Sequence, residues 1–229
     1  MQQQGGRGSA WGVGAGHENL WPARVAILAT IALYASLPDR LAVGPIWLPP
    51  ALEVALLLAL TAMAPIRHAR EARAQRALSF GLIALINAAN IGSLVLLVAG
   101  LLHHGVAIRG RALDGQTLLL AALQIWLTNI LVFALWYWDL DRGGPTARRA
   151  AHREPDFLFA QMVTPACARA TWTPHFLDYL YVSFTNATAF SPTDTMHLTP
   201  WAKMLMAVQS LASLLTVALV AARAVNILS

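Results

Sequence analysis

Five apolar stretches, separated by polar segments, constrain this chain more than any other feature of its sequence. Their approximate ranges are 21–37, 46–64, 78–102, 118–138 and 201–228. The hydrocarbon core of a bilayer is about 30 Å thick and needs about 20 apolar residues per helix. Hydrophobic residues make up 57% of the chain and charged residues 12%, whereas soluble domains carry about 25% charged residues. We therefore expect an all-α polytopic membrane protein with five spanning helices, and we exclude a soluble globular enzyme.

The composition divides the chain into three parts. Residues 1–20 are rich in Gly, Gln and Ser, which predicts a disordered tail. Residues 21–110 hold the first three apolar stretches, and residues 111–229 hold the last two. The first stretch is the shortest and is also compatible with a signal peptide. Its long polar leader and the lack of an A-x-A cleavage pattern favour an uncleaved helix.

The 16 basic residues are distributed unevenly between the apolar stretches. Two helices separate the basic segments 66–77 and 139–200, so both segments lie on the same side of the membrane. Together with Arg7, Arg24 and Lys203, that side holds 12 basic residues and the other side holds four. The positive-inside rule then places the N-terminus in the cytoplasm and the C-terminus outside. Because topology explains the net charge of +5, we expect no nucleic-acid partner.

The segment between the fourth and fifth apolar stretches has the outline of a re-entrant pore loop. A loop over 139–172 leads to Thr173-Pro174, a typical helix start, and to an apolar, aromatic helix over 173–187 that is too short to span. A polar, filter-like turn follows over 188–194, and Thr199-Pro200 begins the last helix, 200–228. Irregular backbone at membrane depth requires cover by protein or by a water-filled cavity.

The run from Asp178 through Tyr181 to Thr185 resembles the pore module of tetrameric potassium channels, and the resemblance extends over residues 116–228. Thr188, Asp194 and Thr199 also match that pattern. The runs W-x-L-D-R-G-G-P (138–145) and S-F-T-N-A-T-A-F-S-P-T-D (183–194) more closely resemble a family of bacterial inner-membrane proteins, which implies no activity. The potassium-channel resemblance implies a homotetramer around a central pore and monovalent cations as permeant partners.

The filter-like turn departs from the potassium-channel pattern. Ser191 and Thr193 occupy the two glycine positions and Pro192 occupies the tyrosine position. Glycines allow the backbone angles that align filter carbonyls, and proline fixes its own φ. We therefore expect a constriction lined by side chains, without potassium selectivity. The pore or filter-like residues would be Thr185, Asn186, Thr188, Ser191, Thr193 and Asp194, with Asp178 and Tyr181 on the pore helix.

On the last helix, four polar residues fall near one face at spacings of four, three and seven: Gln209, Ser213, Thr216 and Arg223. Such a stripe can line water, although Arg223 would repel cations. In potassium channels the pore loop enters from outside, whereas the charge distribution here places residues 173–194 on the cytoplasmic side. An inverted pore, a loop retained without a pore, and an exception to the charge rule each reconcile the two.

Other polar residues fall within the apolar stretches. Glu53 is either an intramembrane functional carboxyl or an interfacial residue. Asn87, Asn90 and Asn129 are typical of hydrogen bonding between helices. Asp139-x-Asp141 is a weak match to the acidic pairs that hold metal–phosphate groups in membrane transferases, and an ion pair with the adjacent Arg142 is the alternative.

The leading hypothesis is a channel-like homotetramer in the lipid bilayer that passes monovalent cations. The first alternative is a non-conducting scaffold or accessory subunit with a degenerate pore fold, favoured by Ser191-Pro192-Thr193 and Arg223. The second is a small transferase that uses Asp139 and Asp141. Because the sequence lacks the Walker A, H-E-x-x-H and G-x-S-x-G motifs, and its single cysteine, Cys167, cannot form a cysteine-based metal site, we expect no enzyme activity, cofactor or metal.

Overall fold

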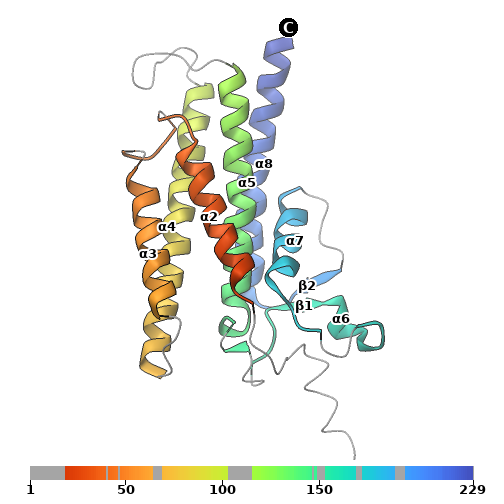
Figure 1. The fold of residues 1–229 in the computed structure, drawn as a ribbon. Helices are drawn as coiled ribbons and strands as arrows, with labels where there is room; N and C mark the ends of the chain where they lie inside the picture. Colours follow the sequence, from red (N-terminus) through yellow and green to blue (C-terminus); the bar gives the residue numbers. More distant parts are fainter. Residues whose placement is uncertain are drawn as a thin grey trace, which may run out of the picture. The chain divides into compact units, whose positions relative to one another are not determined.

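The computed structural model is mostly helical (Figure 1). It describes residues 19–39, 41–45, 47–63, 69–102, 115–145, 147–148, 153–168, 172–188 and 194–228. Within these ranges the α-helices are α2 (Trp21–Ala35), α3 (Leu48–Met63), α4 (Ala69–Leu102), α5 (Gly115–Leu140), α6 (Ala160–Val163), α7 (Phe176–Ala187) and α8 (Pro200–Leu228). The predicted helical class is confirmed at this level.

Three helices are long and apolar enough to cross a membrane, with candidate spans Ala77–Ala99, Gln116–Gly143 and Pro200–Ala221. These spans correspond to the third, fourth and fifth apolar stretches. The helices α2 and α3 have 15 and 16 residues, which at a rise of about 1.5 Å per residue gives lengths of about 22–24 Å. Both are shorter than a hydrocarbon core of about 30 Å, so five full crossings are a proposal and three are compatible with length and composition.

Local side-chain bonds define several helix starts. The Asn19 side chain accepts a hydrogen bond from the Trp21 N–H at 3.0 Å, and the Thr199 hydroxyl accepts one from the Ala202 N–H at 3.4 Å. Both are capping arrangements that satisfy free backbone donors. The helix α7 begins at Phe176, with Asp178 accepting a hydrogen bond from the His175 N–H at 2.7 Å. The expected start at Thr173-Pro174 is therefore too early.

A small antiparallel sheet corrects the purely helical expectation. Its strands are β1 (Phe157–Phe159) and β2 (Thr195–His197), paired with Phe157 opposite His197 and Phe159 opposite Thr195. Phe157 and Phe159 are buried while Leu158 between them is half-buried, as expected for alternating side chains on a strand. Among its described residues, the predicted loop 139–172 thus contains a strand, the short α6 and the 3₁₀ turns η1 (Asp141–Gly143) and η3 (Pro165–Cys167).

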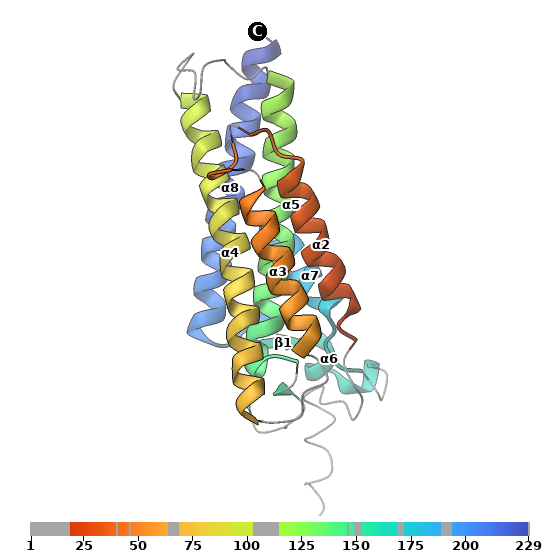
Figure 2. The same cartoon turned by 60° about the vertical axis from the view of Figure 1, so that its left-hand side comes forward.

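Two compact units share the long helices. The first unit comprises the start of the chain up to Val25 and Phe133–Ser210, and the second comprises Ala26–Val132 and Leu211–Ser229. Their boundaries fall inside α2, α5 and α8. Within the second unit α3 lies against α4, as both ribbon views show (Figures 1 and 2).

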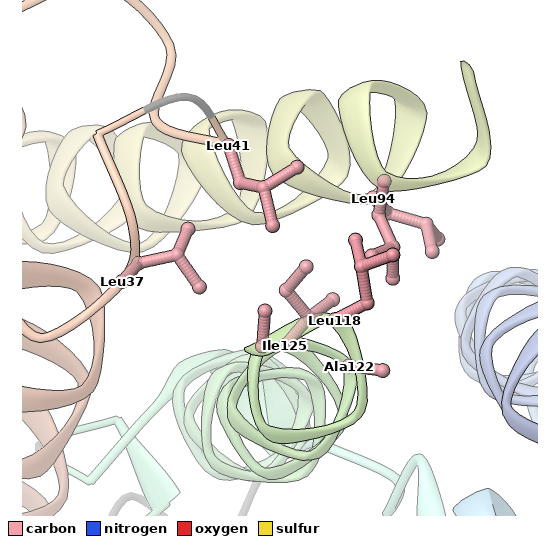
Figure 3. Packing of buried hydrophobic residues seen from close by; sticks show 8 residues of the cluster. Leu37, Leu41, Leu94, Leu118, Ala122 and Ile125 are labelled. Carbon is pink, nitrogen blue, oxygen red and sulfur yellow. The ribbon is translucent and has the colours of Figure 1, made fainter. Parts of the chain in front are cut away.

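The second unit has an aliphatic core between α4, α5 and the segment that follows α2 (Figure 3). Figure 3 shows these side chains directed toward one another. The cluster consists of Leu37, Leu41, Leu94, Leu97, Leu118, Ala121, Ala122 and Ile125. Small alanines on α5 allow the helices to approach closely, which is typical of helix packing in membranes.

Truncation of Leu97 to alanine should destabilise the protein by about 2–5 kcal/mol, because it leaves a cavity in a packed core. Leu97 is 0% exposed, whereas Val95 on the same helix is 60% exposed. Val95→Ala is therefore the matched control and should change the free energy of unfolding by less than about 0.5 kcal/mol. Denaturation in detergent micelles measures both, and equal effects of the two variants would contradict this core.

Candidate functional site

The first unit contains two buried polar networks. We call them the Asp141 network, at the carboxyl end of α5, and the Gln209 network, between α5, α7 and α8. Both include residues that the sequence marks as candidates. Their hydrogen bonds decide whether those residues are available to a ligand, a metal or water.

One oxygen of the Asp141 carboxylate receives three side-chain donors. Oδ2 accepts hydrogen bonds from the Tyr179 hydroxyl at 2.6 Å, from Arg142 Nε at 3.2 Å and from Arg148 Nη1 at 3.4 Å. Asp141 is 0% exposed and both arginines are buried. Arg148 also donates to the Tyr179 hydroxyl and lies over its ring, 5.1 Å from the centroid. The result is a buried ion-pair network with one carboxylate shared by two guanidinium groups.

The other oxygen of Asp141 is bonded to the backbone that enters β1. Oδ1 accepts hydrogen bonds from the N–H groups of Asp156 at 2.8 Å and Phe157 at 3.4 Å. Asp156 adds two further bonds. Its carboxylate accepts a hydrogen bond from the Arg142 N–H at 2.9 Å and another from the Thr199 hydroxyl at 2.7 Å. The carboxylates of Asp141 and Asp156 therefore connect the end of α5 to β1 and to the start of α8.

The Tyr179 hydroxyl lies between the Arg148 guanidinium and the Asp141 carboxylate and bonds to both. It accepts a hydrogen bond from Arg148 and donates one to Asp141. Complete burial raises the pKa of the phenol well above its usual range, and the Asp141 charge acts in the same direction, while Arg148 opposes it. The phenol therefore keeps its proton at neutral pH and remains a donor to the carboxylate.

The turn after α5 depends on residues with left-handed backbone angles. Arg142 has φ 53°, and Gly143 and Gly144 have φ 87° and 93°. A side chain at position 144 would bring its Cβ to 3.0 Å from the Asp139 carbonyl oxygen, so glycine is required there for space as well as for angle. This turn explains the D-R-G-G run as a device that brings Arg142 and Arg148 back to Asp141.

The Asp141 carboxylate therefore has a structural role, since both of its oxygens are bonded to the chain itself. Its two oxygens accept five hydrogen bonds, which is more than the roughly four lone-pair sites of an ionised carboxylate. Within the ranges that the structure describes, no group of three or more His, Cys, Asp or Glu residues could hold a metal ion. The ion pair between Asp141 and Arg142 is the one that the sequence offers as the alternative for this run.

The Gln209 network joins three helices through one amide. Gln209 Nε2 donates to the Ser183 hydroxyl at 2.6 Å and to the Ser183 carbonyl at 2.9 Å. Gln209 Oε1 accepts from the Tyr137 hydroxyl at 2.5 Å and from Asn186 Nδ2 at 2.8 Å. Gln209 is 0% exposed. All four hydrogen-bonding positions of this amide are thus occupied by its own chain.

Asn186 extends the network along α8. Its Nδ2 also donates to the Met206 carbonyl at 3.0 Å, and its Oδ1 accepts from the Ser210 hydroxyl at 3.0 Å. These bonds connect the C-terminal end of α7 to the segment 206–210 of α8. Aromatic rings of Tyr137 and Tyr179 pack on Phe157 with centroids 5.1 and 6.0 Å apart, so apolar contacts surround the polar ones.

The other pore-like residues are placed as follows. Thr185 and Thr188 donate to carbonyls of their own helix, Tyr181 is exposed on α7, and Asp194 is exposed. Ser191 and Thr193 lie outside the described residues, as does the side chain of Arg223. Among the described residues, Asn186 on α7 and Gln209 on α8 are predicted pore residues that the structure joins across two helices.

In the second unit, the polar stripe continues on α8 and also points into protein. Asn129 Nδ2 donates to the Ser213 hydroxyl at 2.8 Å, and Thr216 donates to the Ala212 carbonyl at 2.8 Å. Asn129, Ser213 and Thr216 are buried, and so is Asn90 on α4. Asn129 thus forms the interhelical hydrogen bond that the sequence interpretation predicts for this residue type.

Several important residues were not singled out from the sequence. Tyr137 and Arg148 have no motif, because a tyrosine in an aromatic helix and an arginine in a basic loop are both commonplace. Their roles depend on partners 72 and 31 residues away in the chain.

In comparisons with known proteins, no family model, curated protein or solved structure matches the chain.

Replacing Asp141 with asparagine should destabilise the protein by about 3–5 kcal/mol, because two buried guanidinium groups then lose the negative charge of Asp141. Glu154→Gln is the matched control, since Glu154 is exposed in the same unit, and should have an effect within about 0.5 kcal/mol. Chemical denaturation in detergent gives both values. A free energy of unfolding for Asp141→Asn that equals the wild-type value would show that the network contributes no stability.

The Asn186–Gln209 pair should show a coupling energy of about 0.6–1.7 kcal/mol in a double-mutant cycle of Asn186→Ala and Gln209→Ala, as measured for interhelical hydrogen bonds in membranes. The cycle isolates their direct interaction from the separate losses. Ser210→Ala with Gln209→Ala gives a comparison, because Ser210 bonds Asn186 and not Gln209. Additive effects of Asn186→Ala and Gln209→Ala would contradict a direct bond.

Proposed function

We propose that this chain is an integral membrane scaffold or accessory protein, whose C-terminal half has a pore-module-like arrangement without a path for ions. The observation that carries the proposal is the inward direction of the polar stripe on α8. Gln209, Ser213 and Thr216 are buried and bonded to their own chain. A pore lined by side chains needs such groups to face water.

The opposite face of α8 supports the same proposal. Seven large apolar side chains are exposed there: Trp201, Met204, Val208, Leu211, Leu214, Leu215 and Val217. Lys203, near the start of the helix, is exposed as well. In a bilayer this face is suited to lipid or to a neighbouring transmembrane helix. From Met204 to Val217 the helix therefore presents large apolar groups outward and keeps Gln209, Ser213 and Thr216 inside, which is the reverse of a water-lining helix.

The proposed location is the bacterial inner membrane, with five crossings, the N-terminus in the cytoplasm and the C-terminus outside. The three long apolar helices support membrane insertion. The distribution of basic residues supports the orientation. For α2 and α3, tilting is of no help because they are short, so local thinning of the bilayer or snorkelling of flanking residues would accommodate them.

The second candidate is a homotetrameric pore for monovalent cations. It is favoured by the exposed Asp194 at the end of the filter-like turn and by the resemblance of residues 116–228 to the potassium-channel pore module. Four copies of Asp194 would form a carboxylate ring, which favours cations. This candidate requires a tetramer in native mass spectrometry from mild detergent, because one copy cannot enclose an axis.

Cysteine accessibility in liposomes distinguishes the two candidates. Ser213→Cys and Thr216→Cys are small changes, and the native Cys167 is exposed and serves as an internal standard in the same molecule. The scaffold proposal expects a water-soluble methanethiosulfonate to modify the new thiols at least about tenfold more slowly than Cys167, since a buried thiol reacts only through local opening.

Leu214→Cys, on the exposed apolar face of α8, is the matched control for a lipid-facing position. A membrane-soluble maleimide should label it faster than either buried position. If Ser213→Cys and Thr216→Cys react with the water-soluble reagent as fast as Cys167, a water-filled path exists and the cation-pore candidate replaces the scaffold.

A further inference from the structure

Glu53 is a buried carboxyl in the second unit that differs from Asp141. It is the sixth residue of α3, and it is 0% exposed. Among the residues that the structure describes, none donates a hydrogen bond to either of its carboxylate oxygens. A buried carboxylate without donors is expensive, and in a membrane protein such a residue marks a functional site by default.

The Tyr34 hydroxyl of α2 lies within electrostatic range of Glu53, and the Ser93 side chain of α4 lies beside that hydroxyl. Tyr34 and Ser93 are both buried. The Tyr34 hydroxyl accepts a hydrogen bond from the Val43 N–H at 2.9 Å.

Among the described side chains of α2, α3 and α4, no basic group pairs with Glu53. In sequence, α2 has no charged residue after Arg24, α3 has none besides Glu53, and α4 has none after Arg76. Tyr34 is the titratable group that faces the carboxyl from α2, and the segment of α4 that carries Ser93 supplies none. The described part of these helices therefore leaves the negative charge of Glu53 unbalanced.

We propose that Glu53, with the hydroxyl groups of Tyr34 and Ser93, binds a single monovalent cation, either a proton or a sodium ion. Carboxylate and hydroxyl oxygens are hard ligands suited to such ions. One carboxylate balances one positive charge, whereas a divalent ion would leave an unbalanced charge in the same low-dielectric place. The inference is independent of the scaffold proposal, because a conducting and a non-conducting protein can each hold this ion.

Infrared difference spectroscopy of the full-length protein in liposomes tests the site directly. In sodium-free buffer at neutral pH, the wild-type protein should show a protonated carboxylic-acid band, which is lost in Glu53→Gln and retained in Glu154→Gln. Loss of the band on adding sodium at constant pH identifies sodium as a ligand. A band that persists in sodium and disappears only as the pH is raised identifies the proton.

Tyr34→Phe is a second, milder variant that keeps the test decisive if Glu53→Gln does not fold. Removal of the neighbouring hydroxyl should shift the frequency of the same band. If the wild-type protein in sodium-free buffer at neutral pH has no carboxylic-acid band, Glu53 is ionised without a bound cation and the proposal is wrong. A band that is equally strong in Glu53→Gln, or unmoved in Tyr34→Phe, would likewise overturn it.

Discussion

A polar side chain inside a membrane protein must find its partner within the protein, because hydrocarbon offers neither donors nor acceptors. This constraint shapes the first unit. Asp141 accepts five hydrogen bonds from side chains and backbone, and Gln209 uses its whole amide to bind Tyr137, Ser183 and Asn186. These two centres fix where the end of α5, the strand β1, and the helices α7 and α8 meet, and apolar packing fills the space around them.

The same constraint bears on function. A polar group that is satisfied by its own chain has no need of water, so Gln209 and Ser213 gain little from facing a pore. Opening a water-filled path along this stripe would require breaking several buried bonds together. The polar groups of the stripe thus serve to hold the helices together.

Much of the helical framework could be predicted from the sequence, because long apolar runs have few alternatives. The stripe on α8 was also predicted as one face, since helical periodicity shows which residues lie together. Periodicity cannot show what that face meets, and here it meets α5 and α7 in the first unit. The sheet could not be predicted because strands of three residues show little alternation of apolar and polar residues. The Asp141 network could not be predicted because the D-R-G-G turn, and not a regular spacing in the sequence, brings Arg148 to Tyr179.

Glu53 shows where the constraint is met differently. Asp141 has two guanidinium groups, a phenol and two backbone N–H groups, whereas the described neighbours of Glu53 supply hydroxyl groups and no hydrogen-bond donor to its oxygens. The two buried carboxylates therefore differ in the number of hydrogen bonds that the described residues donate to them. The contrast is explained if the partner of Glu53 is exchangeable, since a proton or a sodium ion can leave and return, and a permanent arginine cannot.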